Sequence, residues 1–162
     1  MKKLLAVAAT ICMVSAQAQE RIGPWTIVPV IEDDALMIYT ENDSNSLFGL
    51  VCSSVDHCVW FMKNDVRCTH QSSYPALVGA NRAPHNALLT CNVSGQHYRY
   101  TFNDFDSTKA AAASGGKLGI VTYMVDGNFN VNRFNIDRYE AAMEVYLQKL
   151  AKRRPRTKDS VL

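Results

Sequence analysis

The chain has 162 residues, of which 48% are hydrophobic and 20% are charged, and its formal net charge is +2. This length suits one domain with a sizeable core. The moderate charge and the ordinary apolar content exclude a disordered or collagen-like chain.

The first 18 residues are typical of a secretory signal peptide. Two lysines precede an uncharged apolar run over residues 4–14, and Ala16 and Ala18 suit a signal peptidase site. The run is shorter than the roughly 20 residues that cross a bilayer, and no later stretch is long and apolar enough for a second span. We therefore predict that residues 1–18 are removed, which leaves a soluble periplasmic or secreted chain that begins near Gln19.

Removal of this segment leaves an even number of cysteines: Cys52, Cys58, Cys68 and Cys91. In an oxidising compartment, two disulfides are expected. Cys52 ends one predicted strand and Cys58 begins the next, so their spacing suits a bridge across a tight loop. Cys68 and Cys91 would then pair by elimination. Four cysteines allow three connectivities, and the sequence does not choose among them.

A zinc site is the alternative use of these cysteines. His57 adjoins Cys58, and His70 follows Cys68 by two residues. However, the chain has no C-x2-C pair and no repeated metal spacing, and export favours oxidation. We therefore predict no metal and no cofactor.

In chain order, the mature sequence consists mostly of predicted strands. Pro24 and Pro29 mark the first as an edge or kinked strand, and Asp126-Gly127 is the strongest hairpin signal. The predicted strands cover residues 22–31, 35–40, 46–52, 57–62, 87–93, 96–102, 118–125 and 128–134.

Two helices complete the predicted elements. Residues 104–114 form a short Ala-rich helix, which an Asp/Ser cluster caps at its start and Gly115-Gly116 ends. Residues 136–152 form an amphipathic C-terminal helix with Asn135 or Asp137 as its cap. We therefore predict an α+β, mainly β fold over residues 19–152. It is an antiparallel sheet or sandwich, with the amphipathic helix packed on one sheet face.

Residues 72–85 form the longest predicted connection, although 77–80 could add a short strand. Connections of this length often carry function, so this segment is the first candidate contact surface. A loop merely held in place by the neighbouring disulfide is the alternative. The candidate contact residues are Tyr74, Asn81, Arg82 and His85.

The C-terminus is basic over residues 153–162. From Lys149 to Leu162 the chain has six basic residues and one acid, whereas the preceding mature part has nine basic and 14 acidic residues. Such a tail suits either a solvated helix end or attraction to an anionic envelope surface. Nucleic acid is not expected, because the body is not basic. The tail cations are Lys152, Arg153, Arg154, Arg156 and Lys158.

The sequence shows no catalytic motif. A His-based hydrolase would need a histidine beside a nucleophile and a carboxylate, but no G-x-S-x-G elbow or H-E-x-x-H helix occurs. Loop or surface histidines are therefore favoured over catalytic ones, and no catalytic residue is assigned. The four histidines are His57, His70, His85 and His97.

Several stretches resemble small exported proteins of Gram-negative bacteria, the invasion-associated locus B group. They are the early Gly23-Pro24-Trp25, the segment 74–78, the hairpin region 118–129 and the late stretch 133–136 before Ala141-Ala142. The resemblance implies a periplasmic or surface-associated β-rich protein that acts at the envelope or host interface. It carries no catalytic residues to this chain.

The leading prediction is therefore an exported, non-enzymatic binding module. It would act through protein or envelope contacts as an inhibitor, an envelope accessory protein or a virulence-associated factor. Two alternatives remain open: an exported hydrolase with a His-based site, and a structural subunit of a secretion or adhesion assembly.

Overall fold

The computed structural model describes residues 19–31, 33–81, 83–95, 97–124 and 126–153. These residues form ten strands and two helices. The strands are β1 (Glu20–Ile22), β2 (Trp25–Val30), β3 (Ala35–Glu41), β4 (Leu47–Ser54), β5 (His57–Asn64), β6 (Ser73–Gly79), β7 (His85–Ser94), β8 (His97–Phe102), β9 (Lys117–Tyr123) and β10 (Phe129–Asn135). The helices are α1 (Phe105–Ala113) and α2 (Tyr139–Lys152).

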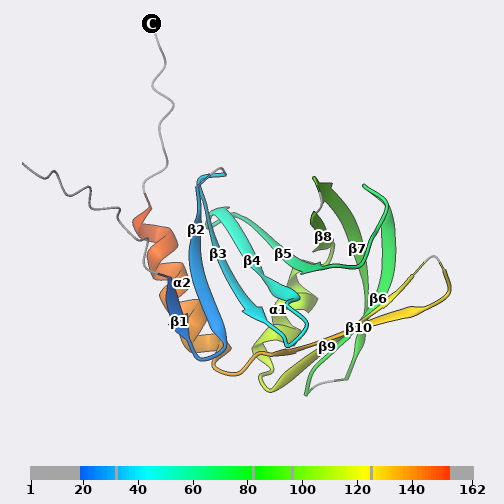
Figure 1. The fold of residues 1–162 in the computed structure, drawn as a ribbon. Coiled ribbons are helices and arrows are strands. Elements are labelled where there is room, and N and C mark those ends of the chain that lie inside the picture. Colours follow the sequence, from blue (N-terminus) through cyan, green and yellow to red (C-terminus); the bar gives the residue numbers. More distant parts are fainter. Residues whose placement is uncertain (1–18, 32, 82, 96, 125, 154–162) are drawn as a thin grey trace, which may run out of the picture.

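The strands form one antiparallel sheet in the order β1-β2-β3-β4-β5-β8-β7-β6-β9-β10. The sheet curls strongly, and the helices lie on its inner side (Figure 1). At one end of the curl, the Thr40 hydroxyl on β3 donates to the Asn135 carbonyl on β10 at 2.9 Å. The predicted mainly β, antiparallel fold with two helices and two disulfides is confirmed, in its single-sheet form.

The core lies between the inner face of the sheet and α2. The side chains alternate along each strand, so one face of β3, β4 and β5 buries its residues. Their aromatic rings pack together with rings from β2, β8, β10 and α2. The rings of this cluster are Trp25, Phe48, Trp60, Phe102, Phe134 and Tyr139.

Helix α2 is fixed to the sheet by buried hydrogen bonds as well as by packing. The Tyr146 hydroxyl donates to the Leu36 carbonyl at 2.7 Å, and burial raises the pKa of this phenol above its usual range. The indole of Trp25 donates to the Asp137 carbonyl at 3.1 Å. The C-terminal helix therefore belongs to the core rather than to an appendage.

Helix α2 begins later than the sequence predicts. Ile136 still belongs to the hairpin, because its N–H donates to the Gly116 carbonyl. The Asn135 side chain accepts from the Asp137 N–H, and the Asp137 carboxylate accepts from the Gly116 N–H. Both expected caps are thus used in the turn before the helix. Arg138, at a φ of 61°, takes the cap position without a side-chain bond.

Pro29 on β2 and Pro75 on β6 lie where their strands lack a second neighbour. Strand β1 pairs with β2 only as far as Ile27, so Pro29 needs no donor on that side. On β6, the ladder with β9 begins at Ala76, one residue after Pro75. The first predicted strand is therefore a partial edge, as its prolines indicate.

The prediction of a long connection over residues 72–85 is wrong for most of that segment. Residues Ser73–Gly79 form β6, which pairs with β7 on one side and β9 on the other. The proline and the lack of polar-apolar alternation in Tyr74-Pro75-Ala76-Leu77-Val78 hide this strand. Only residues 80–84 connect β6 to β7.

Helix α1 has the predicted acidic cap. The Asp104 carboxylate accepts from the Ser107 N–H at 3.0 Å and from its hydroxyl at 2.6 Å. These bonds hold the pKa of Asp104 below its ordinary value. A lowered folded-state pKa means that the stabilisation is present above the ordinary carboxyl pKa and is lost as the pH falls through the folded pKa.

The substitution Asp104→Asn is therefore expected to keep the cap but flatten the acid limb of the stability curve. Thermal melts by circular dichroism, from about pH 6 down to about pH 2, would measure this limb. The matched control is Asp106→Asn in the same helical turn, which should leave the limb as it is. An unchanged acid slope in Asp104→Asn would contradict the assignment.

Candidate binding surface

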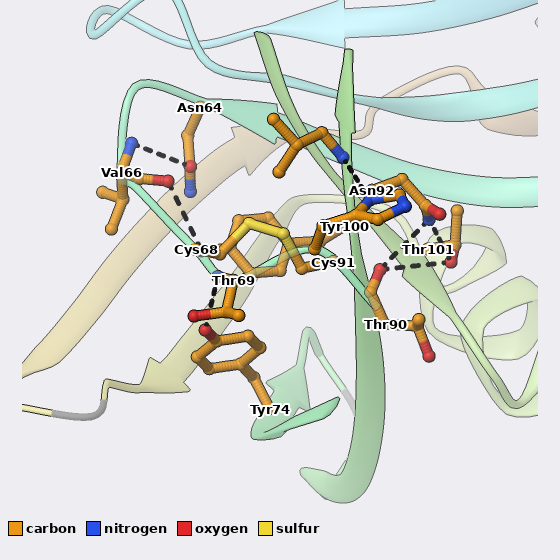
Figure 2. Close-up of a disulfide and its surroundings, with 12 residues drawn as sticks. Asn64, Val66, Cys68, Thr69, Tyr74, Thr90, Cys91, Asn92, Tyr100 and Thr101 are labelled. Carbon is orange, nitrogen blue, oxygen red and sulfur yellow. Dashed lines mark hydrogen bonds between the residues drawn. A yellow bond between two sulfur atoms is a disulfide. The ribbon is translucent and has the colours of Figure 1, made fainter. Parts of the chain in front are cut away.

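Tyr74, the first of the expected contact residues, lies in the core. Its side chain is 4% exposed, and its hydroxyl accepts from the Thr69 N–H at 2.9 Å (Figure 2). The ring packs edge-on against Tyr100, with centroids 5.7 Å apart. Burial, with Tyr74 close by, raises the pKa of Tyr100 to about 12. Tyr74 thus supports the disulfide-bonded connection after β5 and offers little surface.

The other expected contact residues are separated from Tyr74. Asn81 is exposed, and its amide donates to the Ser114 and Gly115 carbonyls at 3.2 and 3.0 Å, which ties this connection to the end of α1. His85 lines a hollow of about 200 Å³ with Ser107 and alanines of α1. Arg82 lies outside the described residues. The four predicted contact residues therefore do not form one surface. The segment 72–85 contributes to the surface described next through other residues.

An apolar surface lies on the outer face of β7, β6, β9 and β10. On β6, Tyr74, Ala76 and Val78 point inward and are at most 7% exposed, so the residues between them point outward. Neighbouring strands add apolar side chains at matching positions. The outer patch, as we name it, consists of Pro75, Leu77, Leu88, Val121, Tyr123, Phe129 and Val131.

The strand register makes the outer patch continuous. Leu77 pairs with Val121, which pairs in turn with Val131 on β10. Tyr123 pairs with Phe129, and their rings meet edge-to-face with centroids 5.4 Å apart. Leu77 is 42% exposed, and Phe129 is 65% exposed. Contiguous exposed apolar side chains of this kind mark interaction sites in soluble proteins.

The sequence reasoning missed the outer patch, although one signal was present. In residues 118–124, apolar residues occur at both inward and outward positions, as at Ile120 and Val121. A strand with a polar solvent face would show polar and apolar residues in alternation. The near-continuous apolar run therefore indicates a strand whose two faces both need cover.

In the described part of the chain, two histidines lie near a serine. His85 lines the same hollow as Ser107, which is bonded to the Asp104 carboxylate, but His85 Nε2 has no hydrogen-bond partner among the described residues. Nδ1 of the exposed His57 lies 2.9 Å from the hydroxyl of the half-buried Ser54 on the β4–β5 hairpin. No carboxylate is hydrogen-bonded to this pair among the described residues. His70 Nδ1 accepts from the Val93 N–H at 3.1 Å. The hydrogen-bonded Ser54–His57 pair thus has no carboxylate partner within the described residues, and it closes a turn.

The start of the basic tail is bound to the domain. Arg153 donates to the Ala35 carbonyl and pairs with the Asp34 carboxylate at 2.9 Å. One turn earlier, Lys149 pairs with Glu20 on β1 at 2.6 Å. These contacts hold the end of α2 against β1 and β3. Lys152 is exposed, and the remaining tail cations lie outside the described residues, namely Arg154, Arg156 and Lys158.

The two disulfides join Cys52 to Cys58 and Cys68 to Cys91. The first closes the β4–β5 hairpin, and the second fixes the connection after β5 to β7 (Figure 2). Stable disulfides of this kind are typical of proteins in oxidising compartments. Among the described residues, no cluster of three or more His, Cys, Asp or Glu side chains could hold a metal ion. Nor does either described helix have the length and apolarity needed to cross a bilayer.

Comparisons with known proteins agree with this fold. The chain matches no protein-family model and no curated protein sequence. Among solved structures, it is similar to invasion-associated protein B from Bartonella henselae, with a TM-score of 0.58 and 14% identity. The match covers 84% of this chain and 99% of that chain. The resemblance to the invasion-associated group is therefore confirmed, and at this identity it shows a shared fold.

Proposed function

We propose that this protein is an exported, non-enzymatic binding module whose outer patch docks onto a protein partner at the bacterial envelope or the host interface. The observation that carries the proposal is the continuous apolar surface across β6, β9 and β10. Contact between such a surface and water is unfavourable. A partner that covers it stabilises the complex by roughly 25 cal/mol per Å² of apolar area removed from water.

Two further features support this proposal. Both disulfides suit an oxidising compartment, and the similar structure is by name an invasion-associated protein. A role as an inhibitor, an envelope accessory protein or a virulence-associated factor is consistent with the same surface.

The substitution Leu77→Lys tests this role, because Leu77 lies at the centre of the outer patch. We expect it to reduce partner capture from envelope or host-cell extracts at least about tenfold, since it would place a charge in a dry apolar contact. A photo-crosslinker introduced at residue 77 would identify the protein that contacts this site. The amount of that one protein that each variant captures is then compared with the amount that the wild type captures.

The matched control is Val59→Lys on β5. Val59 is also 42% exposed and outward-facing, but it lies outside the outer patch. Its substitution should leave capture and the melting temperature as in the wild type. If both variants lose the crosslinked partner equally, or neither does, the outer patch is not the docking site.

A further inference from the structure

Strand β10 is a sheet edge whose free side can be identified from the register. In the described residues it pairs with β9 alone. The Met124 N–H donates to the Asn128 carbonyl at one end of the hairpin, and the Ile136 N–H donates to the Gly116 carbonyl at the other. Antiparallel pairs alternate between bonded and unbonded, so the even-numbered residues of β10 bond with β9. The odd-numbered ones point their N–H and C=O groups away from it.

One end of this free side is already used. The Asn135 carbonyl accepts from Thr40 on β3. The remaining odd residues, Phe129, Val131 and Arg133, lie toward the tip of the hairpin, which extends past β6 (Figure 1). Their side chains also point outward, and Val131 is 45% exposed. This stretch therefore offers both backbone groups and apolar side chains to another strand.

The opposite edge of the sheet, strand β1, is protected against pairing with another chain, whereas β10 is not. Strand β1 has three residues, and Lys149 pairs with its Glu20. Short, charged edge strands of this kind resist pairing with other chains. Strand β10 has seven residues, a regular ladder with β9, and no proline or lysine. Nothing in its own sequence blocks a further strand.

We propose that two copies of this protein pair through antiparallel β10 strands about a two-fold axis at Val131. In this register the sequence Phe129-Asn130-Val131-Asn132-Arg133 is complementary to itself. Val131 faces Val131 of the partner subunit on the axis. Phe129 faces Arg133 of the partner subunit, so a guanidinium can lie against an aromatic ring on each side.

The inner face of the same stretch also fits a second copy. Asn132 is 5% exposed, and its amide donates to the Asn130 side chain at 2.6 Å. In the dimer, Asn130 lies opposite the partner subunit's Asn132, which allows the amides to bond across the axis. Pairing would extend the two outer patches into one surface. This inference does not rest on the proposed partner, because it concerns the edge of β10 and not its face.

Charge substitutions at Val131 provide the test, because this residue faces its own copy. Val131→Lys and Val131→Glu should each weaken self-association at least about tenfold, since like charges would then meet on the axis. An equimolar mixture of the two variants should recover the dimer. Sedimentation velocity on mature protein from about 1 to 200 μM measures all three samples. A wild-type chain that stays monomeric over this range, or a mixture that does not recover, overturns the proposal.

A second measurement fixes the register. The Cα atoms of a bonded antiparallel pair lie about 5.5 Å apart, within the range that a disulfide spans. Val131→Cys should therefore form an intermolecular disulfide under mild oxidation. Leu88→Cys, which is 44% exposed but lies on β7, should not. Equal crosslinking of both variants would indicate face-to-face contact and overturn the edge pairing.

The two proposals fail separately. Leu77→Lys should lose the captured partner yet remain dimeric, because Leu77 lies two strands from the edge. If Leu77→Lys becomes monomeric while Val131→Lys stays dimeric, the copies associate through their outer patches instead, and the edge pairing is wrong.

Discussion

Replacement of Phe48 by alanine is expected to lower the free energy of unfolding by about 3–5 kcal/mol. The ring is fully buried at the centre of the aromatic cluster. It stacks on Trp60 at 5.2 Å and meets Phe102 edge-on at 5.8 Å. Phe134, from the last strand, lies 5.7 Å away. Its loss would leave a cavity that the surrounding β4, β5, β8 and β10 cannot easily close.

Urea denaturation followed by tryptophan fluorescence would measure this loss. The control is Phe129→Ala on the outer face, where the side chain is 65% exposed. At low protein concentration, we expect this control to stay within about 1 kcal/mol of the wild type. A loss below about 1.5 kcal/mol for Phe48→Ala would show that the aromatic cluster contributes less to the core than its burial indicates.

The second large effect is expected from the disulfide between Cys68 and Cys91. Its cysteines are 23 residues apart in the chain, whereas those of the Cys52–Cys58 bridge are six apart. In the loop-entropy model, replacing Cys68 and Cys91 by serine costs about 3 kcal/mol, and replacing Cys52 and Cys58 costs about 2 kcal/mol. Cys91 and Cys52 are both fully buried, so each double variant also has the cost of one buried unpaired hydroxyl, and the loop length makes the difference between them.

The comparison of the two double variants is its own control, because each retains the other bridge. Denaturation midpoints should fall further for Cys68→Ser with Cys91→Ser than for Cys52→Ser with Cys58→Ser. Mass spectrometry of the unreduced wild type should detect no free thiol in the mature chain. The reverse order of stabilities would mean that local packing in the β4–β5 hairpin outweighs the entropy of the longer loop.

The local patterns in this sequence predict the local structure well. Asp126-Gly127 lies at the tip of the β9–β10 hairpin, and Asp104 caps α1 as its sequence indicates. Both signals act within a few residues, where turn chemistry and capping decide the backbone. The disulfides required more, since three pairings were open and only the fold brings Cys68 to Cys91.

The order of the strands in the sheet and the strand β6 could not be predicted from such local patterns. Strand β5 pairs with β8 and not with β6, which is the next strand along the chain. Strands β6 and β7 lie between β8 and β9 in the sheet. No short-range pattern encodes that order. Strand β6 was hidden because Pro75 and Leu77 are apolar on its outer face, where a solvent-facing strand would carry polar residues. The same property makes these residues part of the outer patch, so the error in the fold and the omission at the surface have one cause.

The position of α2 after all the described strands affects when this domain can fold. Tyr146 reaches back 110 residues to the Leu36 carbonyl, and Tyr139 packs against Trp25 on the second strand. Until this helix has been synthesised, the inner side of the first strands has no cover, so a nascent chain cannot complete its core. Stable structure is therefore postponed until α2 has been made. Such a delay would suit the export that we propose, because a translocation channel accepts a chain that is still unfolded.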